Sequence, residues 1–402
     1  MNEKDFLESQ KEEIINLQKM LTSIPAIAPE GGGVGELEKC NALQAWLEKK
    51  GFKNIERYDA PDSRVPSGKR PNLVVTIPGK SSDFNVWVIA HLDVVPPGDI
   101  SLWDTDPWTV VEKDGKIFGR GVEDNQQGLC SAIFAALYYL KSGIIPSRTV
   151  KLLFVADEEN GSALGMIWLL KNTSLFKKND YVLIPDGGDS EGRTIEIAEK
   201  NLLWIQLHVI GKQTHGSRPD SGVNACLAAC DLSLQLNNLE NVFNKKDDLF
   251  EPDHSTFQPT KRAKNVDSIN IIPGEDTFCM DCRILPCYKL SEVIKEVETC
   301  CANIEKKYKV KIECSYPQKS ESPATSPDSE VAKKLALSIE KVHGIKPSFI
   351  GIGGGTVGAE LRREGIDSVV WSTLDDQAHQ PNEYCVISNL IKDSLTMIEF
   401  FK

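Results

Sequence analysis

Four short apolar segments of this chain end in polar residues of one chemical kind. The segments lack alternation between apolar and polar positions, which is typical of strands buried on both faces of a parallel sheet. They are Asn85–Ala90, Val150–Ala156, Tyr181–Ile184 and Ser368–Trp371. In open α/β sheets, ligands bind beyond the carboxyl ends of the strands. We therefore expect the polar residues that follow these segments to converge at one edge of a sheet.

The polar residues after the four segments are histidines and acids. In chain order they are His91 and Asp93, then Asp157, Glu158 and Glu159, then Asp186, and finally His379 after a short loop. A further acid, Asp124, lies in a glycine-containing turn at 119–128, before an apolar helical pattern at 128–142. Such a turn lets the backbone come close to a bound ion.

Two histidines and at least three carboxylates at one sheet edge suit Zn²⁺ or a similar divalent ion. Three carboxylates and one hydroxide carry four negative charges, which balance two divalent cations and would be in excess for one. In two-metal sites the ions lie about 3.5–4 Å apart, so one ligand must bridge them. Asp124 is the best candidate for the bridge. We expect zinc, with cobalt or manganese as alternatives, because carboxylate-rich sites accept several metals.

Neighbouring polar residues leave alternatives open. Asp93 either orients the imidazole of His91 or only caps the end of the strand. Of the adjacent Glu158 and Glu159, one can ligate a metal at a turn while the other accepts a proton from a water molecule as a general base.

A second pattern starts near Asn201, where apolar residues alternate with polar ones. A helical pattern follows at 223–239, then a predicted hairpin of strands 268–272 and 277–283, a helix at 290–307 and a strand at 310–314. This β-α-β-β-α-β order is ferredoxin-like. We expect an α/β fold with a mostly parallel sheet flanked by helices, from residues 1–199 and 317–402, with an α+β domain inserted at 200–316. We interpret 241–265 as a surface loop and 316–329 as a linker.

The motifs together resemble the M20 metallopeptidase family over nearly the whole chain. That family includes acetylornithine deacetylases, succinyl-diaminopimelate desuccinylases, aminoacylases, carboxypeptidases and small dipeptidases. The motifs are His91-Leu92-Asp93, Gly119-Arg120-Gly121 with Asp124, Asp157-Glu158-Glu159-Asn160-Gly161, Pro185-Asp186-Gly187 and Ala378-His379-Gln380-Pro381-Asn382-Glu383. The resemblance implies that His91 and Asp186 bind one zinc, Glu159 and His379 the other, and Asp124 both. It also implies that Glu158 is the general base and Asp93 the partner of His91.

The resemblance extends to the inserted domain, which would be a lid and dimerisation domain. The segment 213–219 is similar to the one whose histidine, here His215, reaches the partner subunit's site in a homodimer and stabilises an oxyanion. Segments around Asn270 and Arg283 are similar to those that hold a substrate carboxylate, although Arg283 could instead form a surface ion pair. In the family, the turn at Gly353-Gly354-Gly355-Thr356 closes over the carboxylate end of the substrate.

Composition excludes several other classes. The chain has 58 acidic and 46 basic residues and a net charge of −12, which disfavours nucleic acid and anionic membranes as partners. No apolar stretch approaches the length of a membrane span, and the first residues lack a secretory pattern. The 11 cysteines are odd in number and include the adjacent pair Cys300-Cys301, which is typical of reduced thiols. We therefore expect a cytoplasmic protein.

The sequence favours a di-metal amidohydrolase that cleaves a small substrate with a free carboxylate, either a dipeptide or an N-acyl amino acid. A hydroxide held between the two ions would attack the amide carbonyl, and Glu158 would pass the proton to the leaving amine. Asp186, the shorter of the two acids found at this position in the family, leans toward peptidases. One alternative is a strict deacylase of the acetylornithine or succinyl-diaminopimelate type. Another is a non-catalytic relative that binds metal or peptide.

Overall fold

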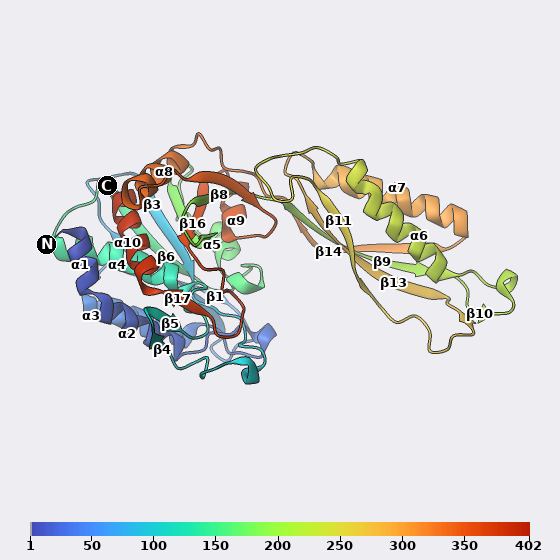
Figure 1. The fold of residues 1–402 in the computed structure, drawn as a ribbon, viewed down its shortest axis with the longest axis horizontal. Helices are drawn as coiled ribbons and strands as arrows, with labels where there is room; N and C mark the ends of the chain where they lie inside the picture. The colour runs from blue at the N-terminus through green and yellow to red at the C-terminus, as the bar shows by residue number, and fades with distance from the viewer. Residues whose placement is uncertain (1) are drawn as a thin grey trace. The chain divides into compact units, whose positions relative to one another are not determined.

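The computed structural model describes residues 2–402, which form two compact units (Figure 1). Unit 1 contains the chain up to Ile197 together with Thr325–Ile350 and Thr356–Lys402. Unit 2 contains Ala198–Ala324 and the short segment Gly351–Gly355. Unit 2 is therefore an insertion in the chain of unit 1, and a second, five-residue segment also belongs to it.

Unit 1 is built on an eight-stranded sheet. In sheet order its strands are β1 (Ile55–Pro61), β2 (Lys69–Ile77), β6 (Arg148–Val155), β3 (Ser81–His91), β7 (Tyr181–Asp189), β16 (Ser368–Thr373), β8 (Thr194–Glu199) and β15 (Ser348–Ile352). The four strands expected from the apolar segments are β3, β6, β7 and β16. They are neighbours at the centre of the sheet and pair in parallel, which confirms the expected α/β class. The pairs β1–β2, β2–β6 and β16–β8 are antiparallel, so the sheet is mixed and not mostly parallel.

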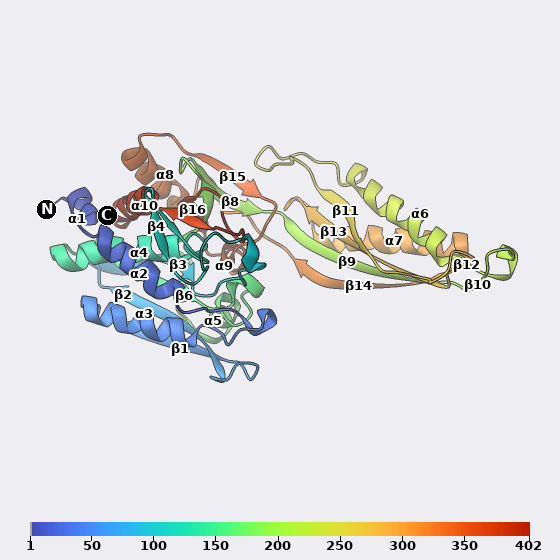
Figure 2. The same ribbon diagram turned by 60° about the horizontal axis from the view of Figure 1, so that its bottom comes forward.

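Helices cover both faces of this sheet (Figure 2). Val182 and Ile184 of β7 pack in one cluster with residues of α5 and α9. Pro185, the next residue of β7, points to the other face and lies against α4. The helices are α1 (Glu3–Ser9), α2 (Lys11–Thr22), α3 (Leu37–Lys50), α4 (Gln126–Ser142), α5 (Met166–Asn172), α8 (Glu330–His343), α9 (Val357–Arg363) and α10 (Ile387–Phe401). A small antiparallel sheet adds β4 (Val111–Lys113), β5 (Lys116–Phe118) and β17 (Tyr384–Val386). Among residues 2–402, no helix is long and apolar enough to cross a membrane.

Unit 2 has a four-stranded antiparallel sheet in the order β11-β13-β9-β14. Its strands are β9 (Asn201–Ile210), β11 (Thr256–Arg262), β13 (Glu275–Ile284) and β14 (Lys311–Ser320). Two helices, α6 (Ala225–Asn237) and α7 (Leu290–Tyr308), share one apolar core with the sheet. The alternating residues Ile205, Leu207 and Val209 all point into this core, as expected. The element order is the ferredoxin-like β-α-β-β-α-β order.

Three details of the sequence interpretation of unit 2 are wrong. The expected hairpin does not form, because β12 (Ile271–Ile272) pairs with β10 (Thr214–His215) and β13 pairs with β9 and β11. The expected loop at 241–265 contains strand β11. The sequence pattern did not indicate this strand because it contains Pro259 and most of its residues are exposed. A proline fits a strand at the edge of a sheet or at a bulge, and the register of β11 shifts between Pro259 and Lys261. The expected linker begins too early, since β14 continues to Ser320.

The contact between α4 and β7 links the fold to the polar sheet edge. An added Cβ at Gly128 would lie 2.4 Å from the carbonyl oxygen of Pro185, the residue before Asp186. Gly128→Ala should therefore lower the free energy of unfolding by about 1–3 kcal/mol through overpacking, despite the better helix propensity of alanine. Denaturant unfolding measures this loss, and Ser142→Ala at the exposed end of α4 is the control. Equal stability of Gly128→Ala and the parent would show that the helix can shift without cost.

Candidate metal centre

Six of the acids and histidines expected at the sheet edge lie together in unit 1, namely His91, Asp124, Glu158, Glu159, Asp186 and His379. Asp124 is at the centre of this group: one carboxylate oxygen is 2.9 Å from His91 Nε2, and the other is 3.1 Å from His379 Nε2. The Nε2 atom of His379 is also 3.0 Å from Glu159, and that of His91 is 3.8 Å from Asp186. The carboxylate of Asp124 thus faces both imidazoles, which is the geometry required of a bridging ligand.

The arrangement fits divalent cations. Ligand atoms of His91, Asp124 and Glu159 lie within 4.8 Å of one another, and so do those of His91, Glu158 and Asp186. Carboxylate oxygens and imidazole nitrogens are donors that zinc, cobalt and manganese accept. The buried Oε1 atom of Glu159 has no hydrogen-bond partner among the described residues, so it is available to a cation. These groupings place Glu158 as near to His91 and Asp186 as a ligand would be.

The pKa values of the cluster show how unfavourable its crowding is. Burial alone would lower the pKa of His91, but the charge of Asp186 and hydrogen bonds to Asp124 and Asp93 raise it well above its usual value. Hydrogen bonds to Asp124 and Glu159 raise the pKa of His379 to about 10. Burial raises the pKa of Asp186 to about 7 and, with the charge of Asp186, raises the pKa of Glu158. A divalent cation would relieve this repulsion between carboxylates.

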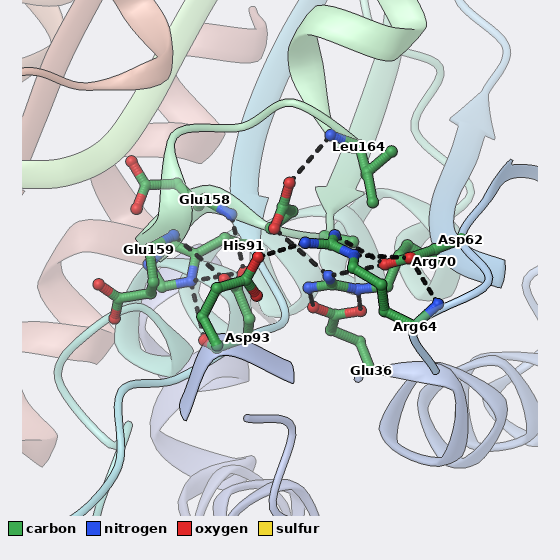
Figure 3. Close-up of polar contacts among 12 residues, drawn as sticks. Glu36, Asp62, Arg64, Arg70, His91, Asp93, Glu158, Glu159 and Leu164 are labelled. Carbon is green, nitrogen blue, oxygen red and sulfur yellow. Dashed lines mark hydrogen bonds and ion pairs between the residues drawn. The ribbon is translucent and has the colours of Figure 1, made fainter. Parts of the chain in front are cut away.

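Asp93 joins His91 to the loop that bears the two glutamates (Figure 3). Its two carboxylate oxygens each accept a backbone N–H at 3.1 Å, one from Glu158 and one from Glu159. Its backbone oxygen lies 2.9 Å from His91 Nδ1. In a neutral imidazole this contact places the proton on Nδ1 and leaves Nε2 free to bind a metal. Asp93 therefore does more than cap the strand.

The glutamate loop is also held by Arg70, which the sequence analysis missed. Arg70 on β2 is fully buried and pairs with both oxygens of Glu36; the Nε–Oε2 distance is 2.6 Å. Its Nη1 atom lies 3.3 Å from Asp157, whose other oxygen accepts the N–H of Leu164 at 3.0 Å (Figure 3). Asp157 has a left-handed backbone (φ 64°) and precedes η3 (Glu158–Asn160). The only sequence signal was a charged residue at the start of an apolar strand.

A second buried carboxylate, Glu383, holds the turn that bears Asp124. Arg120 donates to its Oε2 atom at 2.7 Å, and the backbone N–H of Gly121 donates to the same atom at 2.9 Å. Its Oε1 atom accepts the N–H groups of Glu123 and Asp124 at 2.9 and 3.1 Å. Glu383 is part of the last motif in the sequence analysis, which assigned it no role because its partners lie about 260 positions away in the chain.

The expected site residues of unit 2 form two separate groups. Arg283 pairs with Asp281 through Nε and Nη2, at 2.7 and 3.0 Å, and its Nη1 donates to the carbonyl of Gly353 at 2.6 Å. His215 and Asn270 are exposed near the other end of the sheet, where β10 pairs with β12. Because β13 runs from Glu275 to Ile284, the groups are separated by about 26 Å at 3.3 Å per residue.

The other expected residues lie in the segment that follows β15. Gly354 and Gly355 belong to unit 2 with Gly353. Thr356 belongs to unit 1, where its hydroxyl caps α9 by accepting the N–H of Gly358 at 3.0 Å. The expected surface ion pair of Arg283 is therefore present, and the glycine turn is its neighbour. A guanidinium has five N–H donors, so this pairing leaves some of them for a carboxylate.

Comparison with known proteins identifies the family. The model of peptidase family M20/M25/M40 matches residues 87–402. The chain belongs to this family. An uncharacterized metallohydrolase of Methanocaldococcus jannaschii is 39% identical over 97% of this chain and 99% of its own length. A succinyl-diaminopimelate desuccinylase of Rickettsia bellii is 26% identical over 93% of this chain and 92% of its own. As a family member the chain is a metallohydrolase.

Solved structures share the fold. The aminopeptidase PepT of Bacillus cereus has a TM-score of 0.79 at 18% identity and covers 97% of this chain and 98% of its own. An M20 metallo-carboxypeptidase of Sulfolobus solfataricus has a TM-score of 0.74 at 21% identity and covers 100% of this chain and 99% of its own. Matches of this kind over the full chain place both units within the known architecture of the family.

Removing the Arg70 guanidinium should weaken the glutamate loop. Arg70→Met leaves Glu36 and Asp157 buried without their partner, so we expect a loss of about 3–5 kcal/mol in unfolding free energy. Arg70→Met combined with Glu36→Gln removes most of the unpaired charge and should recover part of this loss. Thermal unfolding measures both. Full stability of Arg70→Met would show that the network contributes little.

Metal binding should release protons. At pH 8 the pKa of about 10 keeps the His379 imidazole protonated in metal-free protein, and the pKa of His91 is raised in the same direction. Because a metal binds neutral imidazole, we expect up to about two protons released per chain and an affinity that rises with pH. Titration calorimetry in two buffers with different ionisation enthalpies counts the protons. Binding without proton release would contradict the inferred protonation.

Proposed function

We propose that this family member is a two-metal amidohydrolase that cleaves a small substrate with a free carboxylate, either a dipeptide or an N-acyl amino acid. The observation that carries the proposal is the position of Asp124, whose two oxygens face His91 and His379. Three further carboxylates lie beside it, those of Glu158, Glu159 and Asp186. Two ions that share Asp124 need only two of these as additional ligands, one for each ion. The remaining carboxylate is therefore available for proton transfer.

In this proposal His91 and Asp186 hold one ion, Glu159 and His379 hold the other, and Asp124 contacts both. Zinc is the proposed metal, with cobalt or manganese as substitutes, because all three bind this donor set. When bound, the ions supply Lewis acidity that polarises the amide carbonyl and lowers the pKa of water. Asp93 fixes the tautomer of His91 through the contact to Nδ1.

Glu158 is the proposed general base. Its backbone N–H donates to Asp93, and its carboxylate lies within 4.8 Å of ligand atoms of His91 and Asp186. A base whose pKa is raised by burial accepts a proton from water and then donates it readily to the leaving amine. Glu159 differs because its Oε2 atom is already 3.0 Å from His379.

Arg283, with Gly354, Gly355 and Thr356, is the proposed binding site for the substrate carboxylate. The glycine turn and the guanidinium are already in contact through Gly353, and the free N–H groups of Arg283 suit a carboxylate. The similarity to relatives named as desuccinylases supports an acylated amino acid as the substrate of this chain. Asp186 instead supports a peptide substrate. Both classes carry the carboxylate that this group would bind.

His215 and Asn270 are proposed to act in the site of a partner subunit. They lie near the opposite end of β13 from Arg283, and a dipeptide-sized substrate cannot contact both groups of the same unit 2. His215 accepts the N–H of Ser217 at Nδ1, so in the neutral ring the Nε2 atom carries the proton and can donate it to an oxyanion. This arrangement supports a homodimer that forms through unit 2.

Replacing the base tests the function. Glu158→Gln keeps the size of the side chain but cannot accept the proton, so kcat should fall by about 10²–10⁴ with the metal content unchanged. Glu159→Gln is the matched control, since it should lose metal as well as activity. The assay is amine release from dipeptides and N-acyl amino acids, with and without chelator. Turnover that survives in Glu158→Gln would assign the base elsewhere.

A further inference from the structure

A cavity of about 190 Å³ borders Glu159 on the side of the amino-terminal segment of unit 1. Most of its wall is apolar. Ile27 and Ala28 form one side, and Val94, Val95 and Pro96, which follow the His91-Leu92-Asp93 motif, form the other. One wall residue, Glu159, is a proposed metal ligand, so the cavity opens directly beside the proposed reaction centre.

The wall is well ordered by hydrogen bonds and close packing. The backbone N–H of Val94 donates to the carbonyl of Ala26 at 3.1 Å, which ties the amino-terminal segment to the end of β3. The carbonyl of Ile27 accepts the N–H of Gly35 at 3.0 Å, and an added Cβ at Gly33 would lie 2.0 Å from that same oxygen. The turn after Ile27 is therefore closed tightly, and the backbone that carries the Ile27 side chain is held in place before a ligand binds.

The charges at the cavity disfavour an anionic ligand. Its two ionisable lining residues are the acids Glu30 and Glu159. Arg64 pairs with Glu30 and Asp62, but it does not line the cavity. Glu30 is thus neutralised from outside, and Glu159 faces His379 at 3.0 Å. A ligand carboxylate would find no cationic side chain in the lining, whereas an uncharged group meets mainly hydrocarbon.

We propose that this cavity binds an uncharged, compact apolar group on the acyl side of the scissile amide. The proposal rests on the proposed function, which assigns the carboxylate on the amine side to Arg283. A cavity of roughly 150 Å³ accommodates benzene, so this one suits a branched or cyclic group of about four to six carbon atoms. The group is either an amino-acid side chain or an acyl chain. The cavity therefore separates this chain from desuccinylases, whose names specify an anionic acyl group.

The first test uses alanine that is acylated on its amino group and varies only the acyl group. The substrates are acetyl-, 4-methylpentanoyl-, succinyl- and leucyl-alanine, and the metal-loaded enzyme is used throughout. We expect kcat/KM to rise at least about tenfold from acetyl to the better of the two branched substrates and to be lowest for succinyl. The 4-methylpentanoyl and leucyl groups differ only in the α-amino group, so their ratio tells an acyl amino acid from a peptide. A preference for succinyl or acetyl would overturn the proposal.

The second test changes the wall. Ile27→Phe narrows the cavity and should abolish the preference for the branched group, while Ile27→Ala should shift the preference to larger groups. Val34→Ala is the matched control, because Val34 is an exposed aliphatic residue of the same segment outside the cavity wall. Metal content is measured for each variant. If the Ile27 variants change kcat/KM for all substrates by the same factor, the proposal is overturned.

Binding without turnover separates the two proposals. Titration calorimetry with 4-methylpentanoate and succinate, the acid products of two substrates, measures the cavity alone. We expect 4-methylpentanoate to bind at least about tenfold more tightly than succinate, and Ile27→Phe to remove this difference. If no amide is cleaved but this selectivity remains, the proposed function fails and the cavity assignment stands. If amides are cleaved but succinate binds more tightly, the cavity assignment fails alone.

Discussion

Repulsion between carboxylates is the constraint on which unit 1 depends. Asp124, Glu158, Glu159 and Asp186 lie around His91 at one edge of the sheet, and burial and mutual repulsion raise the pKa values of Glu158 and Asp186. Such crowding opposes folding unless cations or protons neutralise it. The donor set of a two-metal site is thus a local cost to stability, and the surrounding structure must hold it in place.

The surroundings do so with two further buried carboxylates that bind backbone. Asp93 accepts the N–H groups of Glu158 and Glu159, and Glu383 accepts those of Gly121, Glu123 and Asp124. Each of these carboxylates positions a loop that bears proposed metal ligands. Because the hydrogen bonds are made to backbone N–H groups, contacts within the protein hold the backbone of these loops. The site is therefore preorganised in the way that catalytic constellations require.

Specificity is separated from this shared machinery. Relatives named as desuccinylases and structures titled as peptidases have the same fold, so the fold does not choose the substrate. The features that can choose it are the apolar cavity beside Glu159 and the Arg283 group of unit 2. Apart from Glu159, the residues that line the cavity and those of the Arg283 group are not among the proposed metal ligands.

The sequence by itself determined the central strands, the polar residues that follow them and the ferredoxin-like order of unit 2, because buried parallel strands and alternating strands leave local patterns. It missed β11, where Pro259 and exposed side chains hide an edge strand, and it wrongly paired β12 with β13. Only the tertiary structure revealed the roles of Arg70 and Glu383, the distance between Arg283 and His215, and the cavity. Each of these features depends on contacts between segments that are distant in the chain. A local sequence pattern does not indicate which loop a buried charged residue contacts.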